Sequence, residues 1–201
     1  MTRTLTTLEG LHALYGEPVP AALRKVVPQL TPSYRAWIEG SRFCVISTVG
    51  PNGTDGSPRG DDGPVVRVAD EKTLMMPDWR GNNRLDTLRN IIRDPRVALL
   101  FLIPGSKTTV RVNGRAFLTD EPEVLQSFEQ RGKHPATVIV IEIDEVYIQC
   151  AKALMRSGLW GRDDAETVPT VGEILAEVTN GEVGCGDYDA TYEEKAQPRL
   201  W

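Results

Sequence analysis

Arginine and asparagine side chains gather in one stretch of the chain, and their types suit the binding of an anion. Asn82, Asn83 and Arg84 precede an apolar pattern typical of a helix, so one of the two asparagines is expected to cap its first turn. Backbone N–H groups at a helix start favour a negative charge, and Arg84 adds a guanidinium suited to phosphate. Arg59 follows a predicted strand and is expected to reach the same anion. Asn82 alone would be an ordinary cap and Arg84 a surface charge, but together with Arg59 and Thr109 they favour a cofactor site.

The elements that must position these residues are mainly strands joined by short turns. Residues 50–53 carry a strong turn signal, and residues 69–72 read as a compact hairpin connection. A helix over residues 85–92 ends at Pro95. A short helix over residues 123–130, capped by Asp120, is also expected. Strands are expected over residues 43–49, 65–68, 73–76, 97–103, 108–118 and 136–148. The pattern predicts a mainly β fold, an antiparallel barrel with flanking helices. Periodicity alone does not separate an oligonucleotide-binding barrel, a split barrel and a lipocalin-like barrel.

We expect residues 1–201 to form a single domain, because this length is enough for one substantial domain and marginal for two. Residues 1–41 read as a helical N-terminal extension, with leucines recurring every third residue from Leu5. Residues 42–149 form the barrel core. Residues 150–201 form a C-terminal segment of helix and loop, whose final helix is expected over residues 173–178.

Composition excludes several classes of partner. The net charge of −5, from 23 basic and 28 acidic residues, argues against non-specific binding to nucleic acid or to an acidic membrane. Cys44, Cys150 and Cys185 are widely spaced, with no Cys/His cluster, so no metal site is expected. An odd cysteine count without a secretory signal favours a reducing cytoplasm. No apolar stretch is long enough to span a membrane. We therefore expect a cytoplasmic protein with no nucleic-acid or membrane partner.

Three landmarks occur in an order that resembles the pyridoxamine 5'-phosphate oxidase class of flavin-binding split barrels. The Asn-Asn-Arg of residues 82–84 falls where that class has a phosphate motif at a helix start. Asp-Pro-Arg-Val at residues 94–97 looks like the next landmark, and residues 108–114 look like the third. Residues 57–61, 77–78 and 101–105 are similar to a bacterial branch of these flavoproteins. The resemblance covers roughly residues 42–147 and implies an FMN-binding split β-barrel of antiparallel Greek-key type. It also implies a homodimer with FMN at the interface, contacted by both subunits.

The same resemblance implies a set of cofactor contacts. Val65, Val66 and Arg67 would run along the edge of the isoalloxazine ring, although Arg67 could equally be a strand arginine that faces water. Lys152, Arg156 and Trp160 would contact the substrate or the cofactor of the partner subunit, with Trp160 alternatively in the dimer core. The cofactor-binding residues predicted in this way are Arg59, Val65, Val66, Arg67, Asp78, Asn82, Asn83, Arg84, Thr109 and Arg111.

The activity implied by the resemblance is that of an FMN-dependent oxidoreductase acting on a small molecule, with no catalytic residue assigned. Asn83-Arg84 stands where the oxidase proper has Arg-Lys, and Thr109 stands where it has Gln. Its Arg-x-His substrate motif has no counterpart here, because neither His12 nor His134 fits. Oxidation of pyridoxamine phosphate itself is therefore not expected. Two alternatives stay open: a flavin carrier or redox sensor without turnover, and a barrel that binds haem or a deazaflavin.

Overall fold

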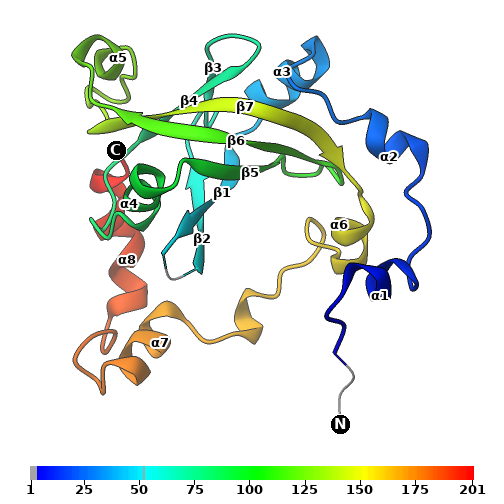
Figure 1. The fold of residues 1–201 in the computed structure, drawn as a ribbon. Helices are drawn as coiled ribbons and strands as arrows, with labels where there is room; N and C mark the ends of the chain where they lie inside the picture. The colour runs from blue at the N-terminus through cyan, green and yellow to red at the C-terminus, as the bar shows by residue number, and fades with distance from the viewer. Residues whose placement is uncertain (1–3, 52) are drawn as a thin grey trace.

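One antiparallel sheet of seven strands forms the centre of the protein in a computed structural model, which describes residues 4–51 and 53–201 (Figure 1). The strands are β1 (Phe43–Gly50), β2 (Gly53–Gly60), β3 (Arg67–Val68), β4 (Thr73–Asp78), β5 (Arg96–Leu102), β6 (Thr109–Thr119) and β7 (Thr137–Gln149). Their order in the sheet is β2-β1-β5-β6-β7-β4-β3. In the described part of the chain no ladder joins β2 to β3, so the sheet is not closed into a continuous barrel. The expectation of an antiparallel, mainly β fold with flanking helices is confirmed.

β2 is the strand that the sequence pattern did not predict. It pairs with β1 from Gly50 opposite Gly53 to Phe43 opposite Gly60, so β1 and β2 form a hairpin across the turn expected at residues 50–53. Asn52 lies outside the described residues. Arg59 was expected to follow a strand, but it lies inside β2 opposite Cys44. β2 is an edge strand, where Pro58 is tolerated because a missing N–H costs no ladder bond on the open side.

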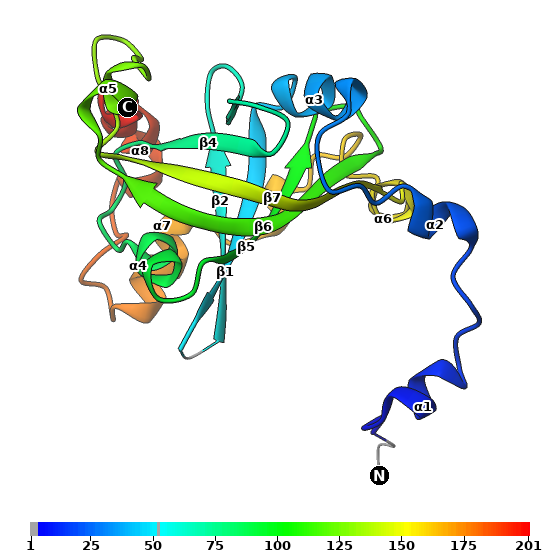
Figure 2. The same ribbon diagram turned by 45° about the horizontal axis from the view of Figure 1, so that its top comes forward.

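The core lies between the curved sheet and two helices, α3 (Pro32–Glu39) and α4 (Asp86–Arg93) (Figure 2). Alternate residues of the strands point inward, as the period of two requires. Ile38 of α3 and Ile91 of α4 are buried against them. The largest fully buried side chains include Phe101, Ile46, Leu74, Met76, Leu99, Ile139 and Ile141. A smaller cluster around Phe128 lies under α5 (Pro122–Gln126).

The remaining helices lie outside the sheet and come before its first strand or after its last strand in the sequence. They are α1 (Leu8–His12), α2 (Pro20–Arg24), α6 (Lys152–Ser157), α7 (Val171–Val178) and α8 (Tyr188–Ala196), with short 3-10 turns at Ala165–Thr167 and Gln197–Arg199. None of the helices in the described ranges has the length and apolar character needed to cross a membrane.

Two helix predictions need correction. Asp120 does not cap α5, which begins after Glu121 without a side-chain cap, because Pro122 already fixes its first turn. The helix near residues 173–178 exists but is not the last one. α8 follows it and brings the chain back to the side of the sheet where α4 lies (Figures 1 and 2). Its sequence is polar almost all round and lacks the apolar stripe that predicts a helix.

Candidate functional site

A cleft of about 990 Å³ lies along one face of β2. Asp55, Ser57 and Arg59 alternate along this strand, are half-buried, and line the cleft together. The other walls come from the end of β4 with the loop that follows it, the start of α4, residues 133–137 and Trp201. The lining residues of β2, from Asp55 to Arg59, span about 13 Å at the usual rise per residue of a strand. The cleft is therefore long, and its two ends are chemically different.

The middle of the cleft holds an ion pair. Arg59 Nη2 lies 3.4 Å from Asp78 Oδ1, and the two side chains are only 26% and 14% exposed. Burial raises the pKa of Asp78, and the charge of Arg59 acts in the opposite direction. In the described residues, two buried side-chain polar atoms lack a hydrogen-bond partner, Arg59 Nε and Thr137 Oγ1, and both residues line this cleft. Because buried polar atoms are normally paired, these two atoms mark the cleft as a place where hydrogen-bond partners are missing.

The turn at residues 82–85 forms the wall beside α4. Asn83 and Leu85 adopt left-handed backbone conformations, with φ of 60° and 59°. Asn82 Oδ1 accepts a bond from the backbone N–H of Arg84 at 3.0 Å, so it serves its own turn. The expected cap by Asn82 or Asn83 is therefore wrong: α4 begins after Leu85 with no side-chain cap. Left-handed residues other than glycine carry strain and gather at ligand sites, and here they leave the first N–H groups of α4 without a side-chain acceptor.

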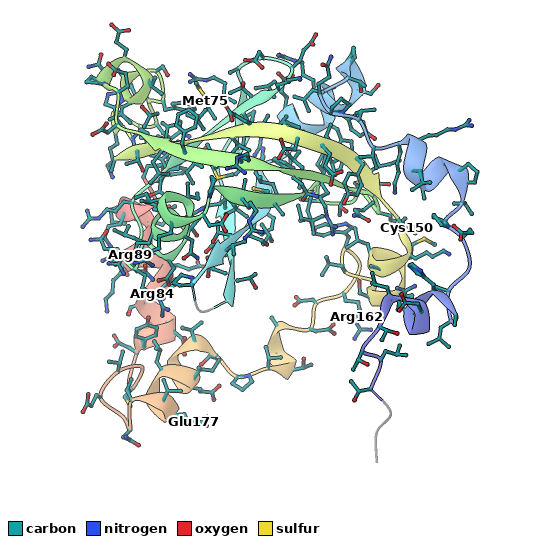
Figure 3. The ribbon with its side chains drawn as sticks, viewed as in Figure 1. Met75, Arg84, Arg89, Cys150, Arg162 and Glu177 are labelled. Carbon is teal, nitrogen blue, oxygen red and sulfur yellow. The ribbon has the colours of Figure 1, made fainter. Side chains whose placement is uncertain are left out.

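Arg84 adds a cation to this wall, but it is largely exposed to solvent. Its Nε lies 2.6 Å from Asp86 Oδ2, and this hydrogen bond raises the pKa of Arg84. Arg84 lies at the same end of the molecule as α8 (Figure 3). Below it, Thr87 Oγ1 lies 3.2 Å from Asp55 Oδ2 and 3.1 Å from Ser57 Oγ. The Ser57 and Thr87 hydroxyls both lie within hydrogen-bond distance of Asp55 Oδ2. This end of the cleft therefore offers the Arg84 cation and the uncapped start of α4 beside the carboxylates of Asp55 and Asp86.

The opposite end of the cleft is aromatic. Asp61 follows β2, and its carboxylate accepts hydrogen bonds from two indole N–H groups, Trp79 at 2.7 Å and Trp201 at 3.2 Å. Lys133 Nζ donates to the main-chain oxygens of Pro198 and Trp201, at 2.9 and 2.8 Å. These contacts hold the segment of residues 197–201 beside the cleft. The sequence analysis assigned none of these residues to the site, although Asp61 is the last residue of the stretch 57–61 that resembles the bacterial branch.

Five of the predicted cofactor residues meet in this cleft, and five do not. Those that line it are Arg59, Asp78, Asn82, Asn83 and Arg84. The other five, Val65, Val66, Arg67, Thr109 and Arg111, are not among its lining residues. The first two are buried in the core, and the last two lie on β6. Arg67 donates to Ser127 Oγ at 2.8 Å and lies 3.7 Å above the ring of Phe128, which ties β3 to α5.

The three predicted contacts to a partner subunit lie around α6, away from the cleft. Lys152 and Arg156 are exposed on this helix, and Trp160 follows it. The Trp160 indole donates to the carbonyl oxygen of Ser106 at 2.6 Å. α6 lies at the opposite end of the sheet from α4 and α8 (Figures 1 and 2). Within one chain these residues do not meet the cleft, and their role stays a prediction for an assembled pair.

Comparison with known proteins gives one family. The model of the family described as pyridoxamine 5'-phosphate oxidase matches residues 30–150. Among curated proteins, none matches the chain.

Solved structures that resemble the chain include HupZ of Group A Streptococcus. The two are 18% identical, and the match covers 58% of this chain and 91% of that one with a TM-score of 0.48. A candidate pyridoxamine 5'-phosphate oxidase of Lactobacillus delbrueckii is 21% identical, covering 60% and 95% with a TM-score of 0.48. A protein named F420 Reductase is 16% identical, covering 60% and 98% with a TM-score of 0.43. The family model spans more than half of the residues of this chain. The chain therefore belongs to the pyridoxamine 5'-phosphate oxidase family, as its three landmarks predicted.

Proposed function

We propose that the protein binds FMN in the cleft along β2, with the phosphate held between Arg59 and the turn at residues 82–85. The observation that carries the proposal is the buried Arg59 Nε, which lacks a partner in the described residues and lies in the same cleft as the uncapped start of α4. A guanidinium and free backbone N–H groups are the usual means of holding a phosphate. The family typically binds a flavin, and FMN carries one phosphate.

The dimensions and lining of the cleft support this choice of ligand. Its volume of about 990 Å³ lies at the upper end of the range for small-molecule sites. One end offers Arg84 and the uncapped start of α4 beside the carboxylates of Asp55 and Asp86, and the other offers the indoles of Trp79 and Trp201. FMN joins a phosphate to a planar ring through a polar chain, so each end of the cleft has a matching part of the ligand. Thr137 Oγ1 is a further buried polar atom of the cleft that lacks a hydrogen-bond partner in the described residues.

We propose further that the protein is an oxidoreductase acting on a small molecule. When bound, FMN supplies the hydride or electron transfer. The chain then supplies binding and orientation: Arg59 neutralises the phosphate, and the indoles confine the ring. A carrier or sensor would use the same site without turnover, so the assay must measure turnover with a reduced nicotinamide and an organic electron acceptor. The absorption spectrum of the purified protein separates FMN from haem and from a deazaflavin.

Arg84 is the residue on which to test the phosphate assignment, because it is exposed and its removal leaves no buried charge unpaired. We expect Arg84→Ala to weaken FMN binding and to leave riboflavin, which lacks the phosphate, nearly unaffected. Arg89→Ala is a matched control, since Arg89 is an exposed arginine of α4 that does not line the cleft (Figure 3). Titration of flavin fluorescence gives both affinities. Equal FMN affinities in the two variants would contradict the assignment.

We also propose that two copies of the chain assemble. The N-terminal segment runs away from the sheet and exposes large apolar side chains, with Leu8, Leu14 and Leu23 each more than 60% exposed (Figure 2). Such a segment gains stability only if other apolar surface covers it. Light scattering should therefore give twice the chain mass of 22.2 kDa. A Leu8→Ser, Leu14→Ser variant should shift toward the monomer, and a monomeric wild-type protein would contradict the proposal.

A further inference from the structure

The segment of residues 197–201 is held at the cleft by three side chains from two separate parts of the chain. The Asp61 carboxylate accepts the indole N–H of Trp201 at 3.2 Å, and Lys133 Nζ bonds the main-chain oxygens of Pro198 and Trp201. The Arg131 guanidinium lies 4.2 Å above the Trp201 ring, a distance at which a cation is attracted to an aromatic face. Together, these contacts fix both the main chain of the segment and the plane of the indole.

The position of the indole points to a role beyond packing. Trp201 lines the cleft and is only partly exposed, although it comes 140 residues after Asp61 in the sequence. Asp61 also holds Trp79, at 2.7 Å, so one carboxylate sets two indoles at the same end of the cleft. Its Oδ1 further accepts the backbone N–H of Asp62 at 2.7 Å, which fixes the carboxylate itself. Large, rigid aromatic surfaces that are oriented in this way suit a planar ring.

We propose that Trp201 contacts the bound ligand directly and slows its release, and that Asp61 is the residue that positions it. The inference rests on the proposed function, because the planar ring is taken to be that of FMN. The indole covers the ring at the end of the cleft opposite Arg84 and the start of α4. Trp201 thereby confines the ring, whereas the arginines hold the phosphate.

The test measures how fast FMN leaves the full-length protein after dilution into excess riboflavin-binding protein, followed by flavin fluorescence. Trp201→Ala should release FMN about tenfold faster than the wild type, since stacking on one aromatic side chain contributes that order of affinity. Trp201→Phe, which keeps a smaller ring, should lie between the two. The control is Leu200→Ala, because Leu200 neighbours Trp201 but does not line the cleft. Bound FMN should also fluoresce more strongly in Trp201→Ala, because an indole in contact with the ring quenches it.

A double-mutant cycle tests the positioning role of Asp61. Asp61→Ala should speed FMN release, because it frees the indoles of both Trp79 and Trp201. Its effect in the Trp201→Ala background should be smaller than in the wild type, because the Trp201 contact is already lost there. Full additivity of the two changes would overturn the positioning role. If the wild type binds FMN and Trp201→Ala releases it at the wild-type rate with unchanged fluorescence, the proposed contact is wrong while FMN binding stands. A wild type that takes up no FMN would overturn both proposals.

Discussion

Replacing Arg59 by methionine should destabilise the protein at neutral pH and much less in acid. Methionine keeps an unbranched apolar stem of similar course but removes the charge that lies 3.4 Å from Asp78. The carboxylate of Asp78, with 14% of its side chain exposed, then stays largely buried without a counter-ion. Such a group is destabilising in its charged form, because neither water nor a partner compensates for its burial.

The size of the effect follows from the geometry of the pair. Two unit charges 3.4 Å apart attract each other by about 5 kcal/mol at an effective dielectric constant of about 20. Removing one member of a fully buried pair costs about 3–5 kcal/mol. Because Arg59 is 26% exposed, we expect a smaller loss, about 2–3 kcal/mol of unfolding free energy at pH 8. With an m-value of about 2 kcal/mol/M, the urea midpoint falls by about 1 M.

The pH dependence has a defined sign. Burial already raises the pKa of Asp78 above its ordinary value of 3.8, and Arg59 opposes this rise. Without Arg59 the folded-state pKa rises further, so the folded protein binds the proton more tightly than the unfolded chain does. Stability then falls as pH increases from about 3.8 through the folded-state pKa, and the full loss is present above it. Near pH 4 the variant should therefore approach the stability of the wild type at the same pH.

Urea unfolding followed by tryptophan fluorescence at pH 8 and near pH 4 gives the four free energies needed. Asp78→Asn provides the matched background, because the amide fills similar space without a charge. In that background Arg59→Met should cost less than about 1 kcal/mol at either pH, since no buried carboxylate is left unpaired. A cost that is independent of pH and persists in the Asp78→Asn background would refute the reasoning and assign the loss to packing.

Two further predictions follow from buried positions. Gly114→Ala should cost about 3 kcal/mol and lower the melting temperature by about 6–12 °C, because a Cβ there would collide with the main-chain oxygen of Glu142 at the β6–β7 bulge. Calorimetry should find Gly63→Ala, which has open space, within about 0.5 kcal/mol of the wild type. Burial raises the pKa of the Cys44 thiol to about 12, so mass spectrometry after alkylation at pH 8 should find adducts on the other two cysteines only. Three adducts on the folded protein would contradict this.

The strands that could be predicted are those whose buried positions appear in the sequence as a run or an alternation of apolar residues. β1, β5, β6 and β7 begin and end within two residues of their expected bounds, since their apolar residues face a core on one or both sides. β2 could not be predicted, because Gly-Thr-Asp-Gly-Ser-Pro-Arg-Gly has no apolar alternation. It is a strand because β1 pairs with it. Such pairing depends on tertiary structure, so the strand propensities of the residues do not predict it.

The candidate site divides along a similar line. The sequence predicted Asp78 and the wall at residues 82–84 as part of the site. These residues precede a helix within a short stretch of chain, so a local motif is enough to place them near its start. Arg59 reached the same cleft as expected, although from inside a strand. Lys133 and Trp201 could not be predicted, because α8 brings them together over a long stretch of chain without a local signal. The resemblance also assigned Arg67 and Thr109 to the cofactor, and within one chain they lie outside the cleft.

In the proposed anion site, burial matters more than the number of charges in deciding which arginine governs the affinity for the ligand. Arg84 is 78% exposed and already bonds Asp86, so water and a neighbour screen its charge. Its main contribution is to attract an anion toward the cleft. Arg59 is 26% exposed and pairs with the carboxylate of Asp78, so an anion that reaches Arg59 competes with Asp78 for the same guanidinium. The affinity for the anion then depends on the difference in free energy between two ion pairs, Arg59 with the anion and Arg59 with Asp78. Because burial favours the neutral form of Asp78, the competition weakens as pH falls, and Arg59 becomes free for the ligand.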